Sequence, residues 1–303
     1  MKSIKNRRDL MKYTVHEWLE KYYHFVIMNT KEGKQAKEYL LSRGIDKDTI
    51  RTFKLGFAPK NVKPTLGFLK SKGYNFNDLV ADKVLTRYKS GKYKGKLTDP
   101  FKGRITFPIR NYQGKTVGFG GRTLDSENKV KYINTPETKN FIKGDNVYGL
   151  ELAKEEIKNQ GYVILFEGYF DTITAYQAGI KNSVSTLGTA LTVNQALLLK
   201  DVTKNIIIAF DGDRAGVEAS FKSASVLQKI GCNIRIAHIT NKYDPDDFIK
   251  EFGKETFIKK VILTAKPVME SFIELKKKDY DLSSPNDRYV YASEVFNTIV
   301  FCK

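Results

Sequence analysis

The sequence predicts an α/β protein in three parts: a basic N-terminal α/β subdomain (residues 1–150), a central parallel sheet (151–264) and a C-terminal helical segment (265–303). Three observations lead to this prediction. Four short apolar runs alternate with helical segments after residue 161, the rhythm of a parallel sheet with crossover helices. The residues before them combine several helical patterns with two alternating strands. After Pro267 only helical patterns remain.

The N-terminal part begins with helices. Apolar residues recur at helical spacing from Asp9 to about Met28, a stripe that is more typical of packing on the helix's own domain than of partner binding. A second helix is expected over Lys34–Arg43 and ends at Gly44, which suits a left-handed cap. A third begins near Asp46, a good N-cap. Two further short helices are expected within residues 63–74 and 75–88.

A basic, glycine-bearing and aromatic stretch follows, YKSGKYKGKLTDPFKG (88–103), and leads into two strands. The strands RITFPIR (104–110) and KTVGFGGRT (115–123) are separated by the turn signal NYQG. The glycines of GFGGRT do not form a dinucleotide-binding fingerprint, because Thr123 stands where the third glycine is needed and no helix follows.

The central part alternates strands and helices. After a helix that ends at Gly161, strands are expected at YVILF, SVSTL, NIIIAF and NIRIAHI. Each is followed by a helix: TITAYQAG, a helix with a Thr192–Gln195 capping box, RAGVEASFKSASVLQKIG, and FIKEFG. The C-terminal segment reads as two helices divided by DLSSPND.

Acidic residues follow three of these strands. They form three pairs: Glu167 with Asp171, Asp211 with Asp213, and Asp244 with Asp246. In an open parallel sheet, ligands bind beyond the carboxyl ends of the strands, so neighbouring strands would bring these carboxylates into one crevice. Carboxylates that close together suppress one another's ionisation, a conflict that a divalent cation removes.

Oxygen ligands without nearby His or Cys favour Mg²⁺ or Mn²⁺ over zinc. An aspartate after a strand is often only a helix N-cap, but three such places in consecutive turns make a metal site the better interpretation. Gly168 and Gly212 lie between acids, where a side chain would obstruct a metal or phosphate. We expect no zinc site, because Cys232 and Cys302, with three histidines, show no ligand spacing.

The net charge of +18 points to a polyanionic partner, nucleic acid first, with a solvated lysine-rich surface as the alternative. Its distribution favours nucleic acid: between Arg87 and Lys143 there are fourteen Lys or Arg against four Asp or Glu. The sequence has no signal-peptide core and no membrane-spanning run, so a soluble, cytoplasmic protein without a membrane partner is expected. A P-loop is absent too, which leaves metal-assisted phosphoryl chemistry without a Walker lysine.

Four segments resemble a known family closely: LFEGYFD, STLGTALT, AFDGDRAG and YDPDDFI, in this order, are similar to the Toprim core of bacterial DnaG-type primases. The upstream segments YLLSRGI, LGFAP, GRITFPIRN, GKTVGFGGR, KYINTPET and FIKGDNVYGL are similar to that family as well. The resemblance covers roughly Lys34 to Phe252. It implies a basic N-terminal α/β subdomain, a central Toprim sheet and a C-terminal helical bundle.

The resemblance also implies residue roles and a reaction. The matching metal-binding acids are Glu167, Asp171, Asp211, Asp213, Asp244 and Asp246, with catalysis assigned to Glu167, Asp211 and Asp213. Positions near template and nucleotide are Arg43, Arg104, Arg122, Lys131, Asn134 and Lys143. The implied reaction is RNA primer synthesis on single-stranded DNA from NTPs, with two or more Mg²⁺ or Mn²⁺ ions.

Two departures from the family pattern matter. The chain has no cysteine before Cys232 for the usual zinc module, and only some 35 residues follow Pro267 where a helicase-binding domain is usual. We therefore expect a bare catalytic core, either an excised piece or a minimal phage-like protein, that depends on a replicative helicase or a separate zinc-bearing module. The alternatives are a Toprim-type nuclease or topoisomerase fragment, and a non-catalytic single-stranded DNA binding module.

Overall fold

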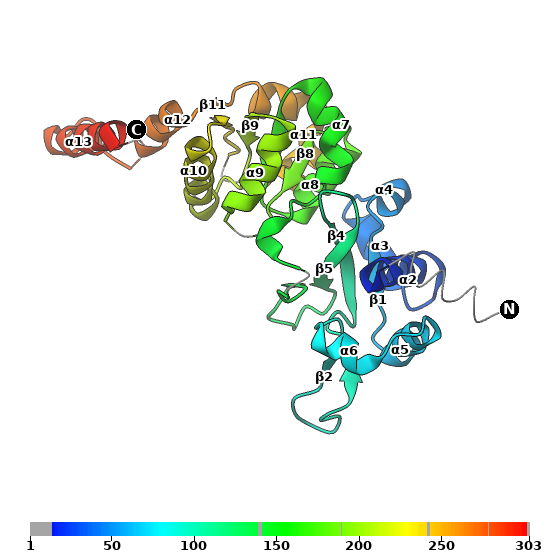
Figure 1. Cartoon of the computed structure of the whole chain (residues 1–303). Coiled ribbons are helices and arrows are strands. Elements are labelled where there is room, and N and C mark those ends of the chain that lie inside the picture. Colours follow the sequence, from blue (N-terminus) through cyan, green and yellow to red (C-terminus); the bar gives the residue numbers. More distant parts are fainter. Residues whose placement is uncertain (1–13, 139–140, 189, 241–242, 278, 302–303) are drawn as a thin grey trace.

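The computed structural model describes residues 14–138, 141–188, 190–240, 243–277 and 279–301. Figure 1 shows an N-terminal helical and β part, a central sheet covered by helices on its faces, and a C-terminal helical pair that projects from the sheet. The mixed α/β class predicted from the sequence is confirmed, and the central strands are parallel as expected.

The N-terminal helices are α2 (Val15–Asn29), α3 (Lys34–Ser42), α4 (Lys47–Thr52), α5 (Val62–Ser71) and α6 (Phe76–Ala81). Helix α2 begins with a capping box between Thr14 and Glu17, while the start predicted near Asp9 lies outside the described residues. Asp46 caps α4 as predicted.

The helix predicted over residues 75–88 was too long, because α6 ends at Ala81. Lys83 takes a left-handed backbone conformation, with φ of 58°, which breaks the helix. The chain then turns Val84 and Leu85 into a hydrophobic cluster with Leu79 and Phe101. Burial of these two apolar side chains thus outweighs the helical pattern of the sequence.

Two small sheets follow. The strands β1 (Gly56–Ala58), β4 (Arg104–Arg110), β5 (Thr116–Thr123) and β6 (Tyr132–Asn134) form an antiparallel sheet in that order. The two strands predicted at 104–110 and 115–123 are therefore confirmed, and they pair with each other. Strands β2 (Thr86–Arg87) and β3 (Leu97–Thr98) form a separate two-stranded hairpin.

The central sheet has the order β11–β10–β9–β7–β8. Its parallel strands are β7 (Val163–Phe166), β8 (Ser183–Ser185), β9 (Asn205–Ile208) and β10 (Asn233–Ile236), the four predicted. The edge strand β11 (Lys266–Pro267) is antiparallel to β10 and was not predicted. Two residues, one of them proline, carry no apolar signal, and proline is tolerated at a sheet edge.

The helices of the central part are α7 (Leu150–Gln160), α8 (Tyr169–Gln177), α9 (Val193–Val202), α10 (Arg214–Lys229) and α11 (Pro245–Phe257). A 3-10 turn (η1, Lys143–Asp145) precedes α7, and a π-helical turn (η2, Ile258–Ile262) follows α11. Helices α8 and α11 begin three residues earlier than predicted. Asp171 and Asp246 therefore lie inside first helical turns, not in loops.

The N-terminal part and the central sheet share a core. One buried cluster contains Ile27, Phe107 and Ile109 together with Tyr169 and Phe170 of α8. The boundary proposed at residue 150 therefore separates segments that pack on each other. The C-terminal helices α12 (Val268–Lys277) and α13 (Pro285–Phe301) form the pair predicted after Pro267.

Candidate metal and nucleic-acid site

The topology brings three of the acid-bearing turns to one edge of the central sheet. Strand β7 connects outward to β8, whereas the chain returns through α9 to place β9 on the other side of β7. The switch point of the sheet therefore lies between β7 and β9, where open α/β sheets bind ligands. Glu167 directly follows β7, and Asp211 follows β9 after two residues, so both acids lie at this switch point.

Glu167 and Asp211 perturb each other. Burial, reinforced by the Asp211 and Asp213 charges, raises the pKa of Glu167 to about 7. Burial and the charges of Asp244 and Asp213 raise the pKa of Asp211 to about 6. A backbone hydrogen bond from Asp211 to the Glu167 carboxylate partly offsets the rise in pKa, whereas the buried Oε1 atom has no partner within ordinary hydrogen-bond geometry. A buried carboxylate oxygen without a donor is a site of unbalanced negative potential, which suits a bound cation.

Of the six predicted acids, Asp171 and Asp246 are the buried ones, 8% and 1% exposed. Asp171 accepts hydrogen bonds from the backbone N–H of Gly168, at 3.0 Å, and of Asp246, at 3.3 Å. Burial, with the charges of Asp211, Asp244 and Asp246, raises the pKa of Asp171. Asp171 is thus held in place by the backbone of both neighbouring turns, which joins the acidic turn after β7 to the one before α11.

Asp246 is already neutralised by protein cations. Its carboxylate accepts hydrogen bonds from Arg43, from Lys250 at 2.6 Å, and from the Thr174 hydroxyl. Its side chain is 1% exposed. With these donors in place, Asp246 is better suited to orienting its neighbours than to holding a cation alone.

Asp213 and Asp244 act as N-caps as well as members of the acidic set. One carboxylate oxygen of Asp213 accepts the Gly216 N–H at 2.8 Å, and one of Asp244 accepts the Asp247 N–H at 2.7 Å. The capping interpretation considered from the sequence is therefore correct for both residues. It does not exclude a metal role, because each carboxylate has a second oxygen.

Asp247 is the acid that the sequence interpretation missed. Carboxylate oxygens of Asp244, Asp246 and Asp247 lie within 4.8 Å of one another, the one such trio among the described residues. The run DPDDF contains this acid, but the Asp-x-Asp pattern includes only Asp244 and Asp246.

The glycines near the acids are required by the protein itself. A Cβ on Gly212 would stand 2.3 Å from the Ile239 carbonyl oxygen, so this glycine permits close approach of two backbones. This close backbone contact requires glycine at 212 independently of any metal or phosphate, so the expectation that Gly212 leaves room for one stays a prediction. A Cβ on Gly168 would approach Asp171 Oδ2 to 2.9 Å, so there the absent side chain does leave room beside an acid.

Two arginines of the N-terminal part lie over one ring of α8. The guanidinium carbons of Arg43 and Arg122 are 5.2 and 5.3 Å from the Phe170 ring centroid. Arg122 is also 5.0 Å from the Tyr39 ring and donates to the Tyr132 hydroxyl at 2.8 Å. Aromatic packing of this kind fixes a guanidinium while keeping it charged. No pattern in the sequence indicated these aromatic partners.

The remaining predicted template residues divide into structural and accessible ones. Arg104 is 8% exposed and donates to the carbonyls of Val130 and Lys131, so it supports the segment before β6. Lys131 itself is exposed. The Asn134 side chain accepts a hydrogen bond from the Tyr169 hydroxyl, which links β6 to α8.

Lys143 lies in a separate cleft of about 420 Å³, lined by Glu137, Ile142, Thr192 and Asn194 among others. Burial lowers the pKa of Lys143. Thus the structure gathers Arg43, Arg122 and Asn134 around α8, whereas Lys143 lines a different hollow beside α9.

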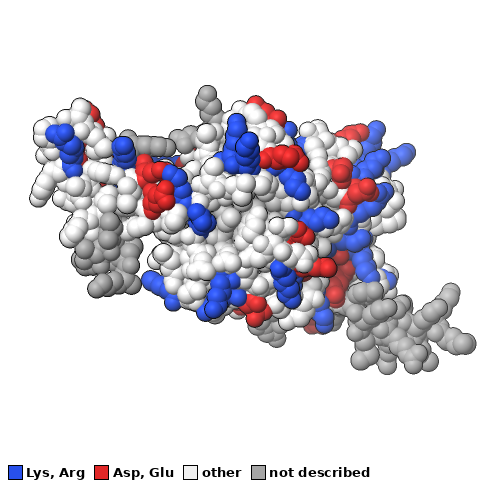
Figure 2. Space-filling model, turned by 90° about the horizontal axis from the view of Figure 1, so that it is seen from above, with Lys and Arg blue, Asp and Glu red and all other residues white. Residues whose placement is uncertain are grey.

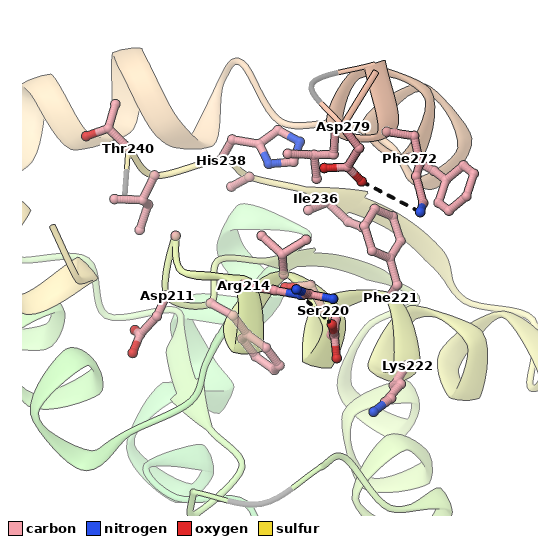
Figure 3. A pocket seen from close by; sticks show the side chains of 18 residues that line it. Asp211, Arg214, Ser220, Phe221, Lys222, Ile236, His238, Thr240, Phe272 and Asp279 are labelled. Carbon is pink, nitrogen blue, oxygen red and sulfur yellow. Dashed lines mark hydrogen bonds and ion pairs between the residues drawn. The ribbon is translucent and has the colours of Figure 1, made fainter. Parts of the chain in front are cut away.

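A larger cleft of about 880 Å³ lies between α10, the end of β10 and α12. Figure 3 shows Phe221, Phe272 and Ile236 within it and Asp211 at its edge. Of the six predicted metal ligands, only Asp211 lines this mostly apolar cleft. The acidic cluster at the switch point and this cleft are therefore different features that share Asp211.

Two family models match this chain. The model for the DNA primase catalytic core, N-terminal domain, matches residues 23–154, and a Toprim-like model matches residues 164–249. A DNA primase of Halalkalibacterium halodurans is 38% identical over 298 residues, which are 98% of this chain and 49% of that protein. A DNA primase of Aquifex aeolicus is 39% identical over 85% of this chain and 50% of its own length. The chain spans about half the length of the curated relatives it matches.

Solved structures agree with these matches. The structure of the zinc-binding and RNA polymerase domains of Aquifex aeolicus primase is 35% identical, covers 94% of this chain and 72% of that chain, and gives a TM-score of 0.77. A DnaG primase catalytic domain bound to single-stranded DNA is 30% identical, with the same TM-score, over 94% of this chain and 88% of that one. Among the described residues, no helix is long and apolar enough to cross a membrane. With its sheet, its acidic switch point and these relatives, the chain belongs to the DnaG-type DNA primase family and contains its catalytic-core and Toprim regions.

Proposed function

We propose that this chain synthesises RNA primers on single-stranded DNA by metal-dependent nucleotidyl transfer from NTPs. The observation that carries the proposal is the acidic crevice at the switch point of the central sheet, next to arginines of a basic N-terminal part. Neither feature alone is specific. Together, in a member of the primase family, they provide sites for metal ions, for phosphates and for a template strand.

The donor set fits Mg²⁺ or Mn²⁺. Four acids that are at least partly exposed supply hard oxygen ligands: Glu167, Asp211, Asp213 and Asp244. The buried Glu167 Oε1 has no partner within ordinary hydrogen-bond geometry. We propose that Asp171 and Asp246 complete and orient this set. When bound, two or more such ions would stabilise the attacking and leaving oxygens of the phosphoryl transfer.

The protein's own groups then have distinct tasks. We assign Glu167, Asp211 and Asp213 as the residues closest to the reacting phosphate, because they lie at the switch point. The Arg43 and Arg122 guanidinium groups, held over Phe170, would bind phosphates of template or nucleotide. The template strand would also contact three further residues: Lys131, Asn134 and Lys143. Arg104 would hold the Lys131 backbone in position through its hydrogen bond to the Lys131 carbonyl.

In this reaction the primer 3′-hydroxyl gives up its proton to solvent, its oxygen forms a bond to the α-phosphorus of the incoming NTP, and pyrophosphate leaves with the electron pair of the broken bond. We propose that a replicative helicase or a zinc-bearing module brings the chain to its template, since phosphate contacts carry no sequence information.

The test is incubation with single-stranded DNA, four NTPs and Mg²⁺ or Mn²⁺. Short RNA products are expected, and Glu167→Gln and Asp211→Asn should each nearly abolish them while folding and DNA binding persist. Cleavage of the DNA instead would support the Toprim nuclease alternative. Wild-type turnover by either variant would overturn the metal assignment.

A further inference from the structure

A basic hairpin, residues 86–98, projects from the N-terminal part. Its strands β2 and β3 pair through Thr86 with Thr98 and Arg87 with Leu97. The pairing continues through two backbone bonds, from Tyr88 N–H to the Lys96 carbonyl at 3.1 Å and from Gly95 N–H to the Tyr88 carbonyl at 2.9 Å. Every residue from 89 to 96 is exposed. This segment buries almost nothing, so the core alone does not explain its composition.

The charge of the basic hairpin has one sign. Residues 86–98 contain five Lys or Arg and no Asp or Glu. Like charges on so short a segment repel one another and lower its stability unless a polyanion is bound. In contrast, Figure 2 shows Lys and Arg interspersed with Asp and Glu on the face that carries the central sheet and the C-terminal helices. The basic hairpin therefore carries positive charge that no acidic residue within it balances.

Two tyrosines are placed among these cations. The rings of Tyr88 and Tyr93 have centroids 5.8 Å apart, and Tyr93 is 49% exposed. Lys96 Nζ lies 5.3 Å from the Tyr93 ring, and Lys102 Nζ lies 4.4 Å from the Tyr88 ring. Exposed aromatic rings flanked by lysines are how proteins bind unpaired bases and their phosphates together.

The base of the hairpin is firmly held. Arg87 donates to the Gly95 carbonyl at 2.8 Å, closing the two arms on each other, and Lys102 donates to the Tyr88 hydroxyl at 2.6 Å. Directly before β2, Val84 and Leu85 are buried in a cluster with Phe101 and Phe119. An anchored base with an exposed tip presents the tyrosines at small entropic cost on binding.

We propose that the basic hairpin is an outlying platform for a single-stranded segment of the template, with an unpaired base stacked on Tyr93. Figure 1 places β2 and its loop at the end of the molecule farthest from the central sheet. The platform therefore holds the strand away from the acidic crevice and acts on template affinity, not on the chemical step. The proposal rests on the proposed function, because that function supplies the single strand.

The pattern favours a single strand over other polyanions. A duplex offers phosphates but keeps its bases stacked, so the tyrosine rings would gain nothing from it. A lipid surface of anionic headgroups would be matched by lysines together with buried apolar side chains, and between 89 and 96 the hairpin has tyrosine as its only apolar side chain.

The test measures binding of the full chain to a fluorescent thirty-residue oligothymidylate by anisotropy over a range of salt. Tyr88→Ala/Tyr93→Ala should weaken binding about tenfold without changing the salt slope, because stacking releases no counterions. Tyr93→Phe keeps a ring and should bind like wild type. Lys92→Ala/Lys94→Ala should flatten the log–log slope by about 1.4 units, at about 0.7 per phosphate on single strands.

Controls separate this proposal from the proposed function. Lys259→Ala/Lys260→Ala removes two exposed lysines of η2 and should leave the slope unchanged. In priming, the tyrosine variant should raise the KM for template and leave kcat at saturating template unchanged. If no variant of the basic hairpin alters binding while the wild type makes primers, the platform is wrong and the function stands. If the variants weaken binding but no primers are made, the function fails and the platform stands.

The rival polyanions give opposite results. The proposal would be overturned if duplex DNA bound as tightly as the single strand. It would also be overturned if Lys92→Ala/Lys94→Ala weakened binding to phosphatidylserine vesicles but not to the single strand. Photo-crosslinking of a 5-halogenated deoxyuridine, placed in the oligonucleotide instead of thymidine, to Tyr93 and mapped by mass spectrometry would support it directly.

Discussion

Arg43, at the C-terminal end of α3, donates a hydrogen bond to Asp246 in the first turn of α11, across 203 positions of the chain. The same guanidinium lies over the Phe170 ring of α8. One side chain of the N-terminal part thus neutralises a buried acid of the central sheet's crevice. The pair couples the placement of the N-terminal part to the electrostatics of the acidic site.

Removing this arginine should destabilise the fold. Arg43→Ala leaves Asp246, whose side chain is 1% exposed, with Lys250 as its one remaining cationic partner, and should lower the free energy of unfolding by about 1–3 kcal/mol. Arg51→Ala is a matched control, because its ion pair with Asp48 is exposed and should contribute less than about 0.5 kcal/mol. Chemical denaturation measures both. Equal losses for the two variants would contradict the coupling.

Neutralising one acid of the crevice should have the opposite effect on the metal-free protein. Glu167→Gln removes a carboxylate that is disfavoured by burial and by the charge of Asp211, so in EDTA its melting temperature should exceed that of the wild type. In Mg²⁺ or Mn²⁺ the variant should gain less stability than the wild type, because a ligand is missing. Thermal melts with and without metal test both statements. If metal raised the melting temperature of the variant as much as that of the wild type, Glu167 would not be a metal ligand.

The raised pKa values predict how stability depends on pH. Glu167 and Asp211 have folded-state pKa values of about 7 and about 6, above their ordinary values of 4.5 and 3.8. These two acids therefore bind more protons in the folded protein than in the unfolded chain between these limits, and their contribution to metal-free stability should fall as pH rises from about 4 to about 7. Bound cations displace those protons, so stabilisation by metal should grow over the same range.

Melting temperatures at pH 5.5, 6.5 and 7.5, in EDTA and in Mg²⁺, give the measurement. The variant Glu167→Gln should show a weaker pH dependence in EDTA than the wild type. A stability that rises with pH in EDTA, with no difference between wild type and variant, would mean that the acids are not coupled as described.

Local sequence patterns predicted much of this fold, because each of these elements depends on residues within one short segment. The four parallel strands are apolar runs, and Asp46 and Thr192 mark helix starts by capping chemistry. The acidic crevice followed from strand ends alone, given that parallel strands share an edge. The sequence could thus place Glu167 and Asp211 close together before any distance was known.

What the sequence could not predict depends on contacts between distant segments. Arg43 pairs with Asp246, and Arg122 lies over the Phe170 ring. Both contacts require the N-terminal part to pack on α8, which no local pattern encodes. For the same reason Arg104 looked like one more basic residue, although its guanidinium is occupied by two backbone carbonyls. Burial decides these roles, and burial is a property of the whole fold.

The accessible lysines should contribute to the salt dependence of DNA binding. Lys131→Ala and Lys143→Ala should each flatten the log–log slope on single strands by about 0.7 to one unit, as expected for one phosphate contact. Arg104→Ala should instead lower the melting temperature, because it removes the donors that hold the Val130 and Lys131 carbonyls. Unchanged slopes in both variants would show that Lys131 and Lys143 are solvent-exposed residues that make no phosphate contact.

Metal content provides the last prediction. The chain has no cysteine before Cys232, which is buried, and His24 hydrogen-bonds the Leu55 carbonyl, so the described residues offer no Cys/His set for zinc. The purified chain should contain no stoichiometric zinc, and Mg²⁺ or Mn²⁺ alone should support its activity. Because its contacts are expected to be mainly to phosphates, primer 5′ ends should map to scattered positions, and a zinc-bearing module or helicase added in trans should raise priming by raising effective concentration. Elemental analysis and 5′-end mapping test this. One zinc per chain would show that the chain holds a zinc site after all. Initiation confined to one trinucleotide by the isolated chain would show that it selects its start sites unaided.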